Sequence, residues 1–520
     1  MRHLSPADVK PLLTDGAEIA FLDIREYGQY GEGHPFFSVN LPYSRLELLA
    51  PVLMPRRTVR AVLFDDGDGV AEKAAARLGE LGYTNLTIMA GGAPAWAAAG
   101  YTLFKGVNLP SKTFGELVEH QMHTPSISAQ ELKALQDAGT DLVLLDGRTP
   151  QEYRKMTIPG ARCCPNAELG YRLPALGLGP GTRLVVNCAG RTRSIIGAQT
   201  LRNLGHDAVA LRNGTQGWAL AGFDLANGIT PQALPVPDRA AARRTARDLI
   251  ARAGIGLIDA AALARQRADE NRTHYLFDVR TAEEFAAGHH PDAVHAPGGQ
   301  LVQATDQWVA VRNAQIVLSD DTGLRAATTA LWLRGMGHRV AILDADASLE
   351  AVPPAAADPA PALRRISPAE AAVRIASGAA PIDLSPSMDH RRAHIAGAVW
   401  SIRPRLGALD LGGATEILLT ARDPTAAGLA ARDLGETHRV PVALIEGGPD
   451  DWRAAGLTVV ATPHSPPDAA CIDYLFFVHD RHDGNMAAAQ AYLDWETGLV
   501  DQLDDQERAV LDPASSLPGS

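Results

Sequence analysis

The stretch LVLLDGRTPQEY, residues 142–153, decides the fold prediction for this chain. Its leading apolar residues indicate a short buried strand that ends at Asp146, and a predicted helix capped by Ser128 precedes it. Another apolar strand runs into the helical stretch SIIGAQTLRNLGH, residues 194–206. Short strands that alternate with helices are typical of βα units on a parallel sheet covered on both faces. The stretch therefore predicts an α/β domain.

The same order of signals occurs four times along the chain. The other strand ends read AFLDIREY (20–27), HYLFDVRTAEEF (274–285) and APIDLSPSM (380–388), and their predicted preceding helix caps are Ser5, Asp259 and Ser367.

Spacing supports the repeat more strongly than composition does. In three copies the strand-end aspartate lies 42 positions before the residue that follows a later apolar strand. The pairs are Asp23 and Asp65, Asp146 and Cys188, and Asp278 and Asp320. Chance would not keep one distance three times, so we expect one unit that is repeated. The fourth copy is shorter, and its equivalent position falls near Thr420 or Ala421.

We therefore expect an α/β protein of four tandem domains, each a small parallel sheet with helices on both faces, followed by a C-terminal helical tail. Aromatic residues should dock the tail, with a helix at 485–503, onto a domain, and the end from Asp512 should be frayed. The expected domains are 1–104, 126–228, 255–349 and 365–460, the linkers are 105–125, 229–254 and 350–364, and the tail is 461–520.

Composition excludes several classes of protein. The 46% of hydrophobic residues and 21% of charged residues are ordinary for a globular protein. A net charge of −12 argues against nucleic acid or an anionic membrane as a partner. The four cysteines are too few to staple 520 residues, and no signal segment is evident, so we expect a cytoplasmic protein without structural disulfides.

The second copy contains a candidate nucleophile in LVVNCAGRTRSIIGAQTL, residues 184–201. Cys188 follows a strand, and a helix is predicted to begin near Ser194, so loop N–H groups and the helix end should form an anion cradle. Arg191 and Arg193 should lower the thiol pKa below its free value of ~8.5. A buried inert cysteine is the alternative, but it would not need two guanidinium groups beside it. We expect Cys188 to be catalytic and to share its binding loop with Ala189, Gly190, Arg191, Thr192, Arg193 and Ser194.

This order of motifs resembles the rhodanese family. The resemblance rests on DGRTPQEY, on IPGA at 158–161, on the cysteine loop and on NGTQGWALAG at 213–222. The whole chain is similar to bacterial multidomain rhodanese-related sulfurtransferases, including VNLPSKTFGE at 107–116 and YLFFVHDRHDGN at 474–485. The resemblance implies a ping-pong cycle in which Cys188 carries the sulfur as a persulfide.

Two further features of this copy bear on the site. Arg148 matches an arginine that reaches toward substrate in some tandem rhodaneses, and an ion pair with Glu152 is an equal alternative. Related phosphatases place five residues between cysteine and arginine, whereas four separate Cys188 from Arg193 here. The shorter loop favours a sulfane sulfur over phosphate or arsenate.

The other copies lack the nucleophile. Asp65 and Asp320 occupy its position in the first and third copies, so we expect these domains and the fourth to be catalytically silent and to act as scaffold. Cys163 and Cys164 fall on a predicted strand, where packing is the main hypothesis and resolution of a persulfide the alternative. The His479–Asp483 segment matches no zinc pattern, and a hydrogen-bonded turn is favoured there.

The predicted function is transfer of sulfur from a small anionic donor such as thiosulfate to cyanide, a thiol or a protein acceptor. No metal or organic cofactor is expected, and a homodimer is compatible with the sequence. The alternatives are a non-catalytic sulfur sensor or adaptor built of these modules and, further from the pattern, a phosphatase or arsenate reductase-like enzyme.

Overall fold

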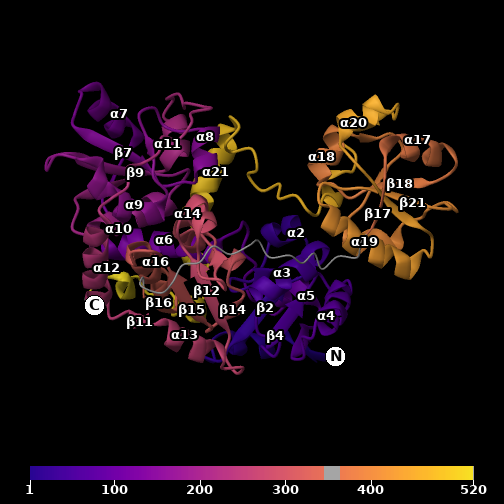
Figure 1. Ribbon diagram of the computed structural model, residues 1–520, viewed down its shortest axis with the longest axis horizontal. Helices are drawn as coiled ribbons and strands as arrows, with labels where there is room; N and C mark the ends of the chain where they lie inside the picture. The colour runs from indigo at the N-terminus through magenta and orange to yellow at the C-terminus, as the bar shows by residue number, and fades with distance from the viewer. Residues whose placement is uncertain (345–362, 519–520) are drawn as a thin grey trace.

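Four parallel sheets follow one another in residues 1–344 and 363–518, the parts of the chain that the computed structural model describes (Figure 1). In the second sheet the order is β6-β10-β9-β7-β8 and every pairing is parallel. The third and fourth sheets have equivalent orders, β11-β16-β15-β12-β13 and β17-β22-β21-β18-β20. The predicted α/β class with repeated small sheets is therefore confirmed.

The strands of the second sheet are β6 (Ser126–Ile127), β7 (Leu142–Asp146), β8 (Arg162–Cys163), β9 (Arg183–Asn187) and β10 (Ala208–Leu211). Those of the third are β11 (Gly256–Ile258), β12 (His274–Asp278), β13 (Val294–His295), β15 (Gln315–Ser319) and β16 (Arg339–Leu343). Those of the fourth are β17 (Arg364–Ile366), β18 (Ala380–Asp383), β20 (Val399–Trp400), β21 (Ile417–Thr420) and β22 (Val442–Ile445), beside a small antiparallel pair of β19 (His394–Ile395) and β23 (Val459–Val460).

The first sheet differs from the others because it includes a strand from the third copy. Its own strands are β1 (Arg2–Leu4), β2 (Ile19–Asp23), β3 (Val39–Asn40), β4 (Ala61–Phe64) and β5 (Leu86–Met89). β14 (Val311–Arg312) pairs antiparallel with β2, where Val311 faces Ala20. The first copy's own strands all pair in parallel, as predicted, and main-chain hydrogen bonds at its open strand edge join the first and third copies directly.

Helices connect the strands of every copy. In the first two copies and the segment between them they are α1 (Pro6–Val9), α2 (Tyr27–Glu32), α3 (Leu46–Leu53), α4 (Val70–Glu80), α5 (Gly92–Ala98), α6 (Leu109–Met122), α7 (Ala129–Asp137), α8 (Pro150–Lys155), α9 (Asn166–Arg172), α10 (Thr192–Asn203) and α11 (Gly214–Leu220). From there on they are α12 (Arg239–Ala253), α13 (Ala260–Arg267), α14 (Ala282–Ala287), α15 (Gly298–Gln303), α16 (Leu324–Gly335), α17 (Pro368–Ala376), α18 (Ser387–Arg392), α19 (Pro424–Thr437), α20 (Pro449–Ala454), α21 (Met486–Thr497) and α22 (Asp505–Arg508).

The predicted helix caps are confirmed in all four copies. Each cap side chain accepts a hydrogen bond from a main-chain N–H of the first turn, which satisfies a donor that the helix itself leaves unpaired. The caps are Ser5 of α1, Ser128 of α7, Asp259 of α13 and Ser367 of α17.

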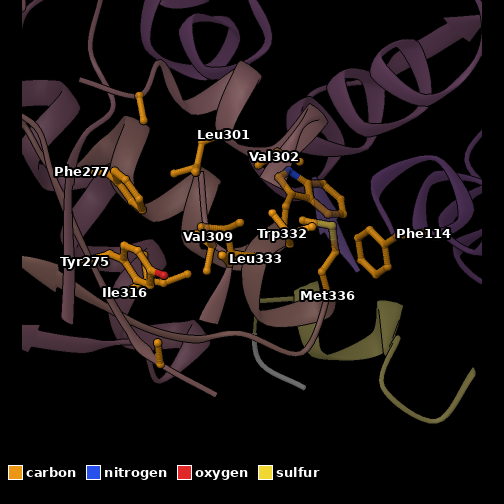
Figure 2. Packing of buried hydrophobic residues seen from close by; sticks show 14 of the residues in the cluster. Phe114, Tyr275, Phe277, Leu301, Val302, Val309, Ile316, Trp332, Leu333 and Met336 are labelled. Atoms are coloured by element: carbon orange, nitrogen blue, oxygen red, sulfur yellow. The ribbon is translucent and has the colours of Figure 1, made fainter. Parts of the chain in front are cut away.

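The first three copies share one hydrophobic core, and the helix α6 is part of it. The ring of Phe114 on α6 lies 6.2 Å from that of Trp332 on α16, and Figure 2 shows Met336 beside them. Trp332 also donates a 2.9 Å hydrogen bond to the Thr200 hydroxyl of the second copy. The predicted linker 105–125 therefore contains a helix that is packed into the shared core.

The fourth copy has separate cores and meets the first copy largely through charged groups. It lies apart from the other sheets in the view of Figure 1. Arg403 forms hydrogen bonds of 2.5 and 2.7 Å with Glu47 of α3, and its Nε donates to Asp433 at 2.7 Å. Arg77 of α4 joins the same network through Asp433. The predicted linker 350–364 lies almost entirely outside the described residues.

The C-terminal tail returns from the fourth copy to the first three. α21 packs against α11 and α6, and the residues after it enter the shared core. Ser516 is fully buried, and Asp512 donates its N–H to the Gly335 carbonyl, so the prediction of a frayed end is wrong for residues up to 518. None of the described helices has the length and apolar character that crossing a membrane requires.

Candidate active site

The loop of residues 188–191 connects β9 to α10 at the carboxyl edge of the second sheet. Asn187 is the last residue of β9 and is in register with Asp146, so Cys188 is the first residue beyond the sheet. The Cys188 carbonyl accepts the N–H of Thr215 at 2.8 Å. Gly214 has φ of +51°, and a Cβ atom there would collide with that carbonyl. The segment NGTQGWALAG, residues 213–222, thus packs against the main chain of the loop.

In the first and third copies the equivalent loop binds a carboxylate. Asp65 is the first residue after β4, the position that Cys188 has after β9. Its carboxylate accepts hydrogen bonds of 2.8–3.0 Å from the N–H groups of Gly67, Gly69 and Ala71. Asp320 likewise accepts the N–H groups of three loop residues at 2.5–2.7 Å, namely Thr322, Gly323 and Ala326. In both copies the loop is an anion cradle that is filled by its own aspartate.

The cradle of the second copy has no such built-in anion. In the described part of the chain, none of the main-chain N–H groups of residues 189–193 donates to a protein acceptor. The Cys188 thiol lies 3.6 Å from the hydroxyl of Ser194, which donates to the Arg191 carbonyl at 2.7 Å, and the Ser194 N–H also faces the sulfur. The Ser194 hydroxyl and N–H are therefore the donors recorded near the sulfur.

Burial sets the acidity of Cys188. The residue is only 2% exposed. Burial raises the pKa of its thiol above the ordinary value, and the charge of Arg193 and the Ser194 hydrogen bond only partly oppose this. The prediction of a lowered pKa is therefore wrong for this arrangement of the site, because desolvation of the thiolate outweighs the nearby positive charge.

The two loop arginines are already paired with carboxylates. Arg191 binds Glu116 of α6 through hydrogen bonds of 2.7 and 2.8 Å and also contacts Glu119. Arg193 binds Glu152 of α8 through hydrogen bonds of 2.6 and 2.7 Å. These carboxylates neutralise the guanidinium groups that were predicted to stabilise the thiolate.

Arg148 has a different partner from either of its predicted ones. It is 2% exposed, and it donates to both carboxylate oxygens of Asp146 at 2.9 and 2.7 Å and to the Met156 carbonyl at 2.6 Å. Glu152 binds Arg193 instead. The first and third copies contain the same pair as Asp23 with Arg25 and Asp278 with Arg280. In this structure Arg148 therefore has a structural role, and the prediction of an ion pair with Glu152 is wrong.

The repeat and its loops agree with known proteins. A family model described as the rhodanese-like domain matches residues 5–99, 128–221 and 259–347. The chain belongs to the rhodanese-like domain family. Residues 365–460 lie outside these matches, and their sheet order relates them to the other rhodanese-like domains.

Solved structures extend the comparison to the whole chain. The crystal structure of a thiosulfate sulfurtransferase from Pseudomonas aeruginosa is 41% identical, with 98% of this chain and 99% of that chain covered and a TM-score of 0.89. A rhodanese-related protein from Thermoplasma volcanium is 26% identical over 20% of this chain and 97% of its own, with a TM-score of 0.18. No curated protein sequence matches the chain.

The fourth rhodanese-like domain also places a carboxylate at its loop. Asp383 is in register with Thr420, so Ala421 occupies the cysteine position. Two residues later, Asp423 accepts the N–H groups of Thr425 and Ala426. The first, third and fourth domains therefore each satisfy N–H donors at this position with an aspartate, and the second domain has a thiol instead.

Sequence reasoning missed the residues from other segments that pack against the Cys188 loop. On α21, Glu496 accepts a hydrogen bond of 2.7 Å from the Thr192 hydroxyl, and Tyr492 lies against Gly190. Gln216 of α11 borders the same glycine. The aromatic residues of the tail predict that it docks, but no local pattern assigns it to this loop.

The other cysteines are not joined to Cys188. Cys163 and Cys164 are free and buried, and burial raises the pKa of Cys163 to about 12. Cys163 also lines a cavity of about 560 Å³ between the second and third domains, and Cys188 does not. The described residues contain no cluster of side chains suited to a metal ion.

Proposed function

We propose that this protein is a sulfurtransferase in which Cys188 carries the transferred sulfur. The observation that carries the proposal is the cradle: a loop whose N–H groups bind a carboxylate in the silent domains begins with a thiol in the second domain, where the N–H groups of residues 189–193 have no acceptor among the described residues. Donors so arranged suit a persulfide anion and the anionic molecule that delivers its sulfur.

The reaction divides into two balanced steps. The Cys188 thiolate attacks the outer sulfur of a thiosulfate-like donor, a sulfur–sulfur bond forms, and sulfite leaves with the electron pair of the broken bond. Cyanide or a thiolate then attacks the terminal sulfur of the persulfide, and the Cys188 thiolate is released. The N–H groups of residues 189–193 stabilise the charge on sulfur in both steps.

The three silent domains serve as scaffold in this proposal. An aspartate side chain cannot form a persulfide, and in each silent domain it occupies donors that the chemistry would need. The shared core holds the first and third domains against the second, and the β2–β14 pairing joins the first domain to the third.

One alternative is favoured by a specific observation. The deep burial of Cys188 and its raised pKa suit a sulfur sensor that is modified slowly and does not turn over. The sensor and the enzyme differ in whether sulfur leaves Cys188 repeatedly.

The test uses the full chain treated with thiosulfate and then with cyanide. Intact mass should show one added sulfur atom that is absent in Cys188→Ser, and thiocyanate should accumulate over many cycles. Loading of Cys188 without repeated release would identify a sensor. Absence of loading, in a protein whose free Cys188 still reacts with an alkylating reagent, would contradict transfer from this donor.

A further inference from the structure

The C-terminal helix α21 closes over the catalytic loop. Its Glu496 is 1% exposed, and its Oε1 accepts from the Thr192 hydroxyl at 2.7 Å. The second oxygen, Oε2, has no hydrogen-bond partner and lies 3.0 Å from the place where a side chain on Gly190 would begin. Tyr492 lies 3.1 Å from the same point. Together with the loop, these side chains keep Cys188 from solvent.

Aromatic and charged contacts hold the helix in place. The ammonium of Lys112 on α6 lies 4.6 Å from the ring centre of Trp495 and 5.3 Å from that of Tyr492. The guanidinium of Arg481 lies 4.5 Å from the Tyr492 ring on the other side. Glycines flank the helix at Gly484, which has φ of +95°, and at Gly498.

The arrangement in which α21 covers the loop is destabilised by the unpaired oxygen of Glu496. A buried carboxylate normally satisfies both oxygens, and one left without a partner destabilises the state that buries it. Glu496 has one hydroxyl donor and the nearby charge of Lys112. The free energy of closure is therefore smaller than the apolar contacts of α21 alone would provide.

We propose that α21 is a lid on Cys188 and that Glu496, when the lid is closed, takes the place of the anionic group of the sulfur donor. This inference rests on the proposed function. Each silent domain satisfies its loop with an aspartate of the loop itself. In the second domain the carboxylate at the loop is that of Glu496, which binds the Thr192 hydroxyl and not the loop N–H groups. It comes from another part of the chain, so it can leave, and an anionic donor must displace it to reach the sulfur.

The first test measures access to Cys188 with iodoacetamide, a small neutral alkylating reagent. Removal of the Tyr492 ring in Tyr492→Ala should weaken closure and raise the alkylation rate by about tenfold or more, since loss of a packed aromatic ring costs several times the thermal energy. Gln490→Ala, on the exposed face of the same helix, should react as the unchanged protein does. Equal rates in all three proteins, at equal thermal stability, would overturn the lid.

The second test measures the role of the Glu496 charge. Glu496→Gln keeps the size of the side chain and its acceptor for Thr192, so the lid should still close. The ratio of the alkylation rates by iodoacetate and iodoacetamide should rise by about fivefold, because the negative reagent no longer meets a negative side chain. An unchanged ratio would show that Glu496 does not compete with anions.

The two proposals fail separately. If no variant loads sulfur from thiosulfate while Tyr492→Ala still exposes Cys188 to alkylation, the sulfurtransferase proposal fails and the lid stands. If Glu496→Gln loads sulfur with an unchanged KM for thiosulfate and an unchanged reagent ratio, sulfur transfer stands and the role of Glu496 is wrong.

Discussion

Glu152 holds Arg193 in a two-pronged ion pair with distances of 2.6 and 2.7 Å, directly beside the catalytic loop. Among the groups that lower the pKa of Cys188, Arg193 has the largest effect. The carboxylate of Glu152 therefore controls how much positive charge reaches the sulfur. Burial opposes ionisation of Glu152, but Arg193 lowers its pKa to about 2, so it is negative at neutral pH.

Glu152→Gln should lower the pKa of Cys188, because the variant leaves the charge of Arg193 uncompensated. The rate of alkylation by iodoacetamide at neutral pH should rise by about threefold to tenfold, and its pH midpoint should shift downward. Glu152 also closes a capping box with Thr149, so the control must lose a similar contact. Glu131→Gln removes the equivalent carboxylate of the Ser128 capping box and should leave the midpoint unchanged. An unchanged midpoint in Glu152→Gln would mean that this ion pair does not govern the thiol.

Asp65→Ala should destabilise the first domain locally. The substitution leaves the N–H groups of Gly67, Gly69 and Ala71 without their acceptor at the start of α4, at a cost of about 2 kcal/mol. Hydrogen–deuterium exchange should become faster in residues 65–80. The control is Glu72→Ala in the first turn of α4, because the Glu72 side chain is exposed. Equal exchange rates in both variants would mean that the hydrogen bonds to Asp65 do not stabilise the loop and the start of α4.

Arg403→Met should release the fourth domain from the first. Glu47 would stay buried without its cation, and breaking such a pair from one side costs about 3–5 kcal/mol. Small-angle scattering should give a larger radius of gyration, and protease should cut the chain between the domains more quickly. Arg405→Ala, on the same short 3-10 helix, breaks only an exposed hydrogen bond to Ala470 and should leave both measurements unchanged. A compact Arg403→Met protein would show that the ionic contact is dispensable.

His34→Gln should flatten the dependence of stability on pH. His34 is fully buried, and burial lowers its pKa to about 3. The folded state keeps the ring neutral, whereas the unfolded state takes up a proton below about pH 6.5. The free energy of unfolding is therefore not reduced by His34 above pH 6.5, and it falls as the pH is lowered toward 3. The slope is about 1.4 kcal/mol per pH unit for one proton. Urea denaturation of the unchanged protein and of His34→Gln between pH 6.5 and 4 should differ by this slope. His464→Gln, at an exposed histidine, should keep the original slope, and a slope retained in His34→Gln would assign it to other groups.

The local part of the site could be predicted from sequence. The 42-residue spacing, the helix caps and the strand ends are short-range patterns, and they placed Cys188 and its loop after β9 correctly. The prediction for the acidity of Cys188 went wrong because it counted charges near in sequence. Glu116 and Glu496, which act on this loop, lie far from it along the chain, and only the packing of α6 and α21 brings them there.

The sequence by itself determined the α/β class, the presence of a repeated unit and the one repeat that contains a thiol. These follow from strand and helix periodicity and from residue identity, which do not depend on how the repeats are arranged. The tertiary structure alone decided that the thiol is buried, that both loop arginines are paired and that a C-terminal helix covers the loop. Burial and electrostatic screening depend on distances between segments remote in the chain, and a linear pattern contains no such distances.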